Sequence, residues 1–262
     1  MPKNFLHGLF SAPDAGDAID GKLLCYDWRL DGQPAVFGVD MRLCARAPIR
    51  SLPVLAYVGF LPAGGGELDG KTVAKALKFI KKCAKELELS VAGYIQTNDE
   101  LQYYIYLAAV ADYERMKALA SEEKGVECRV GGRTEPDWSS YFTVLYPDDA
   151  KRETVRNGEI IAELYSKGDS EAPRRINLHL AFPTDAARAA FASEALNEGF
   201  ATGDTIDGSD GGEDCPFELS VHRICALKKW DIDALTVHAI RIAEKHGGRL
   251  LYWDCPIVPE RL

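Results

Sequence analysis

Between Arg174 and Trp253 the spacing of apolar residues changes from a period of two to a helical period and back again. Residues 175–182 alternate apolar and polar side chains, which is the pattern of a half-buried strand. Thr184 is a good helix N-cap residue, and Gly199 is suited to end the helix that it opens. Asp231 and Gly247 bound a second helix, and further strands are expected at residues 200–206, 217–227 and 249–253. The order strand, helix, strand, strand, helix, strand predicts a ferredoxin-like unit.

The N-terminal part of the chain shows the same order of elements with additional strands around it. The apolar pattern predicts helices at residues 72–87 and 112–123, and strands at residues 22–30, 34–41, 52–61, 91–97, 101–108, 126–133 and 139–146. Asp31 and Gly32 between the first two strands are typical of a tight hairpin turn. The predicted fold class is therefore α+β, with two ferredoxin-like (split β-α-β) domains, the N-terminal one with extra strands.

A charged helix at residues 148–165 leads into the polar segment 167–173, which contains Gly168 and Pro173. Segments of this composition commonly connect domains. We therefore expect an N-terminal domain at residues 1–167 and a C-terminal domain at residues 174–262.

Composition favours a soluble cytoplasmic protein that binds another protein. The 262 residues carry a formal net charge of -9, which disfavours direct binding to nucleic acid because phosphate contacts need local positive charge. The seven cysteines include no C-x-x-C pair and are expected to be reduced thiols. The longest apolar run, residues 54–61, is too short to span a membrane, and the N-terminus lacks a secretory signal pattern.

The segment from Gly65 to Thr72 matches the phosphate-loop pattern G-x-x-x-x-G-K-[ST]. In that interpretation Gly65 and Gly70 let backbone amides surround phosphates, Lys71 reaches the outer phosphates and Thr72 holds magnesium. The alternative is a flexible loop at a helix start. The second interpretation is favoured, because the helix leads into a hairpin instead of the parallel strand that phosphate-loop folds need. A nucleotide or small-ligand binding protein remains the main alternative function.

An acidic loop and a polar sheet face are the candidate partner-binding features. Acidic residues without a basic residue among them occupy the loop, at Asp204, Asp207, Asp210, Glu213 and Asp214. The loop could steer a basic partner segment or be a solvated loop. His179 and His222 fall on strands expected to be neighbours, and Asn177 shares the exposed polar face. No third residue has zinc-ligand spacing, so zinc is not expected. Carboxylates at short spacing in the acidic loop could suit calcium, but the EF-hand ligand order is absent, so no metal or cofactor is assigned.

Six aromatic residues cluster in the N-terminal part, at Tyr94, Tyr103, Tyr104, Tyr106, Trp138 and Tyr141. Aromatic side chains on adjacent strands can line a groove, but more often they pack across strands, with tyrosine hydroxyls at the rim. No serine or cysteine lies in a nucleophile motif, so no catalytic residue is assigned. An uncharacterised hydrolase with a site between the domains is the weakest alternative.

The C-terminal part resembles the RraB family, the bacterial regulators of ribonuclease E activity B. The resemblance rests on residues 175–182, Gly199-Phe200, 204–218, 221–223, Asp231-Ile232 and 247–253. It implies a non-enzymatic cytoplasmic protein that binds and restrains an RNase E-type ribonuclease.

The N-terminal part resembles a bacterial domain-of-unknown-function family, number 695. The resemblance rests on residues 52–60, 93–95 and 103–106, and on Asp137, Trp138, Tyr141, Tyr146 and Pro147. Fusion of these two kinds of domain is familiar. The resemblance implies no known activity for the N-terminal domain, and the oligomeric state stays open.

Overall fold

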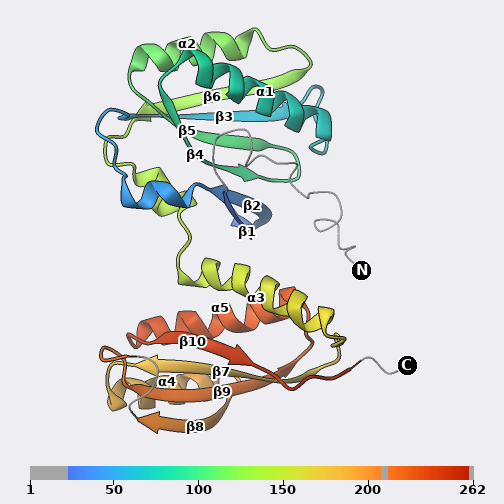
Figure 1. Ribbon diagram of the computed structural model, residues 1–262, viewed down its shortest axis with the longest axis vertical. Helices are drawn as coiled ribbons and strands as arrows, with labels where there is room; N and C mark the ends of the chain where they lie inside the picture. Colours follow the sequence, from blue (N-terminus) through green and yellow to red (C-terminus); the bar gives the residue numbers. More distant parts are fainter. Residues whose placement is uncertain (1–22, 208–211, 260–262) are drawn as a thin grey trace. The chain divides into compact units, whose positions relative to one another are not determined.

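The computed structural model describes residues 23–207 and 212–259, and the chain divides into two compact units, Met1–Tyr146 and Pro147–Leu262 (Figure 1). The division therefore lies before helix α3 (Asp149–Ser166), and not in the predicted linker 167–173. Helix α3 is where the sequence predicts a helix, but it packs along α5 (Lys229–Lys245) and adds Ile161 to the C-terminal core. Both units are α+β, as expected.

The predicted linker is a fixed part of the C-terminal unit. The guanidinium of Arg174 donates to Asp169 (Nη1 to Oδ1, 2.5 Å), and both residues are buried. The Asp169 carboxylate also accepts a hydrogen bond from the backbone N–H of Val258 (2.9 Å), and Asp169 forms a β-bridge with Pro259. The buried ion pair fixes the segment after α3 to the start of β7, and the hydrogen bond and bridge of Asp169 fix it to the segment after the last strand.

The C-terminal unit has the predicted ferredoxin-like topology. Its elements are β7 (Arg174–Phe182), α4 (Asp185–Asn197), β8 (Ala201–Asp207), β9 (Phe217–Cys225), α5 and β10 (Arg249–Asp254). The strands form an antiparallel sheet in the order β10-β7-β9-β8. Thr184 caps α4 as predicted, but α5 begins at Lys229, so that Asp231 lies in its first turn instead of capping it.

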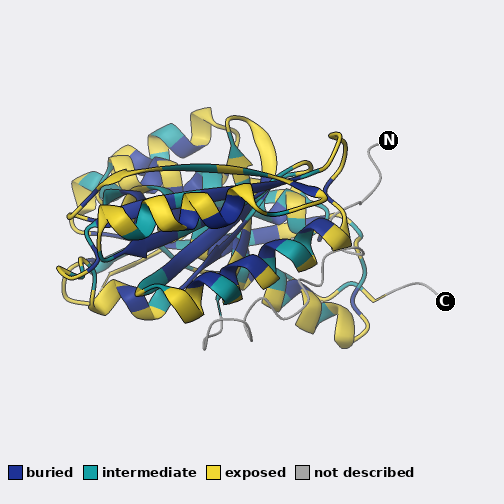
Figure 2. Cartoon of the chain, turned by 90° about the horizontal axis from the view of Figure 1, so that it is seen from above, coloured by how far each residue is buried: buried dark blue, intermediate teal, exposed yellow. Residues whose placement is uncertain are grey.

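One face of this sheet forms the core with the helices. Ile176, Leu178 and Leu180 of β7 are fully buried and pack in one cluster with Phe191 of α4 and Leu235 of α5. The alternate residues of β7 point to the other face, which no helix of the described residues covers. Helix α4 buries Phe191 and Ala195, helix α5 buries a longer row that includes Ile232, Leu235 and Ala239, and both keep exposed residues between these positions; Figure 2 colours the chain by burial.

The N-terminal unit contains the same arrangement with an added hairpin. Its elements are β1 (Leu24–Leu30), β2 (Gln33–Val39), β3 (Val54–Pro62), α1 (Gly70–Glu86), β4 (Leu89–Gln96), β5 (Leu101–Leu107), α2 (Val110–Ser121) and β6 (Val126–Thr134). The antiparallel sheet has the order β1-β2-β4-β5-β3-β6, so the β1-β2 hairpin extends a ferredoxin-like sheet at β4. Asp31 and Gly32 form its turn, with φ values of 49° and 80°.

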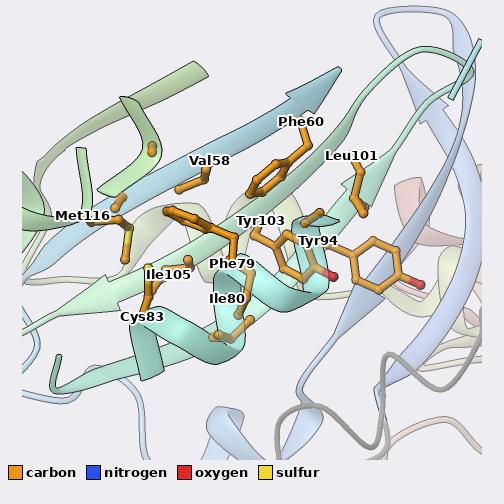
Figure 3. Packing of buried hydrophobic residues seen from close by; sticks show 14 of the residues in the cluster. Val58, Phe60, Phe79, Ile80, Cys83, Tyr94, Leu101, Tyr103, Ile105 and Met116 are labelled. Carbon is orange, nitrogen blue, oxygen red and sulfur yellow. The ribbon is translucent and has the colours of Figure 1, made fainter. Parts of the chain in front are cut away.

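Helices α1 and α2 cover one face of this sheet. Figure 3 shows Phe79, Ile80 and Cys83 of α1 and Met116 of α2 packed with Val58 and Phe60 of β3 and with residues of β5. Helix α2 begins after Ala109, whose backbone N–H donates to the Asp112 carboxylate (3.1 Å), so Asp112 supports the helix start from the first turn. Among the described residues, no helix has the length and apolar character needed to cross a membrane.

The predicted strand at residues 139–146 is wrong, because this segment is helical and ends in a single π-helical turn, Tyr141–Leu145. Trp138 has a φ of 56°, which turns the chain before the helix begins. The indole of Trp138 stacks on the Tyr106 ring with centroids 3.7 Å apart and donates from Nε1 to the Leu52 carbonyl (2.9 Å). The segment from Trp138 to Leu145 lies against the sheet face opposite α1 and α2, over β2 and β4. We call it the covering segment.

The six aromatic residues confirm the expected packing role. Five of them are buried, and Tyr104 is half-buried. The expectation that their hydroxyls lie at the rim is wrong for two of them, because the Tyr106 hydroxyl donates to Glu135 Oε1 (2.6 Å) and the Tyr141 hydroxyl donates to the Asp40 carbonyl (3.0 Å). Buried tyrosines usually find such partners.

Glu135 is the buried acceptor that holds the covering segment. Its carboxylate accepts from the Tyr106 hydroxyl, from the backbone N–H (2.7 Å) and hydroxyl (3.0 Å) of Ser140, and from Arg133 Nε (2.8 Å). Burial by itself raises the pKa of Glu135, but the hydrogen bonds from Tyr106, Ser140 and Arg133 outweigh it and lower the pKa below 4.5. The charged form is therefore favoured by folding.

We expect the stability of the N-terminal unit to depend on pH through Glu135. A carboxylate with a lowered folded pKa stabilises the fold above its unfolded pKa, and that contribution is lost as the pH falls through the lowered value. Glu135→Gln should lower the urea midpoint at pH 7 and flatten its dependence below pH 4.5. Urea unfolding followed by NMR signals of β3 and β5 measures both. An unchanged slope in Glu135→Gln would contradict the assignment.

Asn157 joins α3 to the rest of the C-terminal unit. It is fully buried and uses its whole amide: Nδ2 donates to Asp233 Oδ1 and Thr236 Oγ1 (2.9 Å each), and Oδ1 accepts from Trp253 Nε1 (2.7 Å). One side chain thereby links α3 with α5 and β10.

Replacement of Asn157 by Ala should destabilise the C-terminal unit by about 2 to 3 kcal/mol, because the Trp253 N–H is left buried without an acceptor. Urea unfolding followed by NMR signals of β7 and β10 measures the change. Asn197→Ala on the exposed end of α4 is the matched control and should stay within about 0.5 kcal/mol of the wild type. Equal midpoints for the two variants would contradict the role of Asn157.

Candidate functional site

The uncovered face of the C-terminal sheet brings together the predicted residues Asn177, His179 and His222. Asn177 lies directly opposite His222 across the β7-β9 pair, and His179 lies opposite Ser220. On its other side β7 pairs with β10, where Tyr252 lies opposite His179 and Asp254 opposite Asn177. The face also carries Arg175, Glu218, Ile206 and Ile224. We call this surface the open face, and it consists of Arg175, Asn177, His179, Ile206, Glu218, Ser220, His222, Ile224, Tyr252 and Asp254.

His179 is at the centre of the open face, between two carboxylates. Its Nδ1 lies 3.2 Å from Glu218 Oε1 and its Nε2 lies 2.7 Å from Asp254 Oδ2. The imidazole also stacks on the Tyr252 ring, with centroids 4.2 Å apart and planes 15° from parallel. A neutral imidazole donates from one nitrogen only, so both contacts are hydrogen bonds when the ring is an imidazolium or when one carboxyl is protonated. The ring is held in a single orientation either way.

Asn177 extends this network to the edge of the open face. Its Nδ2 donates to Asp254 Oδ1 (2.7 Å), and its Oδ1 accepts from Arg175 Nε (2.7 Å). Asp254 therefore receives one bond from Asn177 and one from His179. Glu218, whose side chain is only 7% exposed, closes the network on the β9 side. The polar groups of the open face thus hold one another in place.

His222 differs from His179, because its Nδ1 is buried and has no hydrogen-bond partner among the described residues. Burial lowers the pKa of His222, and the positive charge of Arg175 lowers it further. His222 is therefore neutral at physiological pH.

The acidic loop residues do not form one uniform surface. Asp204 and Asp207 are exposed on the edge strand β8, and Glu213 and Asp214 are exposed in the turn before β9, whereas Asp210 lies outside the described residues. Asp207 forms an ion pair with Arg188 of α4 (Oδ1 to Nη1, 2.7 Å). Its charge is partly compensated. No group of three or more His, Cys, Asp or Glu residues in the described ranges is arranged to hold a metal ion.

The open face also carries exposed apolar side chains that the sequence reasoning missed. Ile224 is 71% exposed, Ile206 is 51% exposed and Tyr252 is 45% exposed. Tyr252 and Asp254 were missed as well. The predicted topology places the last strand beside the first, so alternation along residues 249–254 is the signal that would have identified them.

The segment from Gly65 to Thr72 is a capped helix start. The Asp69 carboxylate accepts a hydrogen bond from the backbone N–H of Thr72 (2.7 Å) and so occupies the helix end where a phosphate would bind. Thr72 is buried, and Lys71 is exposed. The strand after α1, β4, does not pair with β3, which has β5 and β6 as its neighbours. This arrangement favours the loop interpretation over the phosphate interpretation.

We expect Asp69→Ala to lower the thermal midpoint of the N-terminal unit and Lys71→Ala to leave it unchanged, because the cap, and not the lysine, stabilises α1. Differential scanning calorimetry measures the midpoints. Calorimetric titration with ATP provides a second readout. Binding of ATP that is lost in Lys71→Ala would show that the segment is a phosphate loop.

One protein-family model matches the C-terminal unit. Residues 155–255 match the model of the family Regulator of ribonuclease activity B. The C-terminal unit is therefore similar to RraB domains. The match begins within α3 and ends directly after β10, so it includes every strand of the open face. The resemblance of the N-terminal unit to family 695 stays a prediction, since the match does not reach that unit.

Comparison with individual proteins adds no functional information. No curated protein matches the chain. Among solved structures, a crystal structure of an unknown protein from Galdieria sulphuraria covers 78% of this chain and 99% of its own, at 13% identity and a TM-score of 0.22. A similarity at that TM-score supports no conclusion about fold or function.

Proposed function

We propose that this chain is a cytoplasmic regulatory protein without catalytic activity of its own, and that it binds a protein partner through the open face. The partner proposed is a ribonuclease of the RNase E type. The observation that carries the proposal is the RraB family match, which spans the whole sheet that bears the open face.

The composition of the open face supports association with a protein. Ile224, Ile206 and Tyr252 offer apolar area, and energetic hot spots at protein interfaces combine such area with ordered polar groups. The network of Asn177, His179 and Asp254 is already ordered, so little side-chain entropy is lost when it meets a partner.

The exposed acidic residues suit a partner segment that carries positive charge. Asp204 is exposed on β8, and Glu213 and Asp214 are exposed in the turn before β9. We propose that they act with Asp207 and Asp210 to attract such a segment. Exposed charges of this kind mainly increase the association rate and do so most at low salt. The apolar side chains then decide how long the complex lasts.

The direct test is Ile224→Ser, assayed for binding to an RNase E-type ribonuclease and for inhibition of RNA cleavage. Loss of this exposed apolar side chain from the interface should weaken binding by about 1 to 2 kcal/mol, roughly tenfold. Surface plasmon resonance measures the affinity, and cleavage of a labelled RNA measures the inhibition. Because Ile224 is exposed, the variant should unfold at the wild-type midpoint.

Leu196→Ser is the matched control, because Leu196 is 54% exposed on α4, on the helical side of the sheet. It should bind and inhibit as the wild type does. Wild-type protein that neither binds nor inhibits the nuclease at micromolar concentration would exclude this partner. Equal weakening by Leu196→Ser and Ile224→Ser would show that the open face is not the binding surface.

A further inference from the structure

The N-terminal sheet has a hollow on the face opposite α1 and α2. The covering segment lies over β2 and β4, while the part of the same face formed by β5, β3 and β6 carries half-buried polar side chains. A depression of about 340 Å³ is present there. Its lining residues are Tyr57, Glu100, Gln102, Arg129, Val130 and Gly131.

Two glycines create the hollow. A Cβ atom on Gly131 would lie 2.2 Å from the Tyr57 ring, and a Cβ atom on Gly59 would lie 1.9 Å from Glu100 Oε1. The Tyr57 ring therefore lies across the β6 backbone, and the Glu100 side chain lies across the β3 backbone. Any larger residue at either position would push these side chains away from the sheet. The glycines thus determine where the aromatic ring and the carboxylate are.

The charge of the hollow is uneven. Arg129 is compensated, because its Nε and Nη2 each lie 2.9 Å from Glu127 Oε1. The Glu100 carboxylate, in contrast, makes no hydrogen bond or ion pair with any residue in the described ranges, although Glu100 is half-buried. A partly buried carboxylate without a direct ion-pair partner favours a cation, even though the charge of Arg129 is nearby.

We propose that this hollow binds the guanidinium or ammonium group of an arginine or lysine side chain in a basic peptide segment. Glu100 is the counter-ion, the Tyr57 ring provides an aromatic wall for a cation–π contact, and Gln102 offers an amide oxygen. The hollow is shallow enough for an extended peptide to lie over it, and its volume suits one side chain. The proposal concerns the N-terminal unit and is independent of the function proposed for the open face.

The environment of Glu100 agrees with this assignment. Burial raises the pKa of Glu100, Arg129 lowers it, and the nearby Asp99 and Glu127 raise it again, so that the pKa is above 4.5. A bound cation would stabilise the carboxylate and lower that pKa. Binding should therefore weaken as the pH falls and Glu100 takes up a proton.

The test is an NMR titration of the full chain with acetyl-arginine-amide and with the tripeptide Gly-Arg-Gly. Both probes should produce saturable shifts of the amides of Tyr57, Gln102 and Gly131, with tighter binding of the tripeptide. Glu100→Gln should weaken binding at least about fivefold. Gly59→Ala should do the same at an unchanged unfolding midpoint, because its methyl group displaces only the end of a flexible side chain.

Glu122→Gln is the matched control, since Glu122 is an exposed carboxylate at the end of α2 and should not affect binding. Three results would overturn the proposal: no saturable shift with either probe, equal binding by Glu100→Gln and the wild type, or preferential binding of acetyl-glutamate-amide. The last result would show that Arg129, and not Glu100, recognises the ligand.

Discussion

The two helices of a strand-helix-strand-strand-helix-strand unit cover only one face of its sheet, and this constraint shapes both halves of the protein. In the C-terminal unit α4 and α5 bury Ile176, Leu178 and Leu180, and the alternate residues of β7 must be acceptable to water. In the N-terminal unit α1 and α2 bury Val58 and Phe60 in the same way. The second face of each sheet is thus free to carry other structure or to meet a partner, and the two units use it differently.

The N-terminal unit covers part of its second face with its own chain. That covering is too short to form a large apolar layer, and it depends on one buried carboxylate. The Glu135 carboxylate accepts hydrogen bonds from Tyr106 of β5, Ser140 of the covering segment and Arg133 of β6. Trp138 stacks on Tyr106 beside it. Charge-assisted hydrogen bonds of this kind tolerate burial because every partner is present. Removing one partner would leave the others buried and unsatisfied.

The sequence was sufficient for the topology but not for the contacts of individual side chains. Period-two alternation and Gly or Asn turns identified the strands of both units. The prediction of a strand at residues 139–146 was wrong because the aromatic residues there are typical of strands. In the structure the segment is helical, since the Glu135 carboxylate accepts the Ser140 N–H and the positive φ of Trp138 turns the chain. The unit boundary was misplaced because the ion pair of Asp169 and Arg174 is a tertiary contact that composition does not reveal. Asn177, His179 and His222 were correctly placed together, but Asp254 and Tyr252 depend on the β7-β10 register.

A net charge of -9 says little about where negative charge is available, because many carboxylates are already engaged. Asp69 caps a helix, Asp207 pairs with Arg188, and Glu218 lies against His179. The polar groups of the open face largely satisfy one another, so in the proposed complex they would mainly provide orientation, and Ile224, Ile206 and Tyr252 would provide most of the affinity. At the hollow the opposite holds, because the Glu100 carboxylate has no hydrogen bond or ion pair among the described residues and is influenced by Arg129 only through its nearby charge. The recognition proposed there is therefore electrostatic and depends on a cation supplied by the ligand.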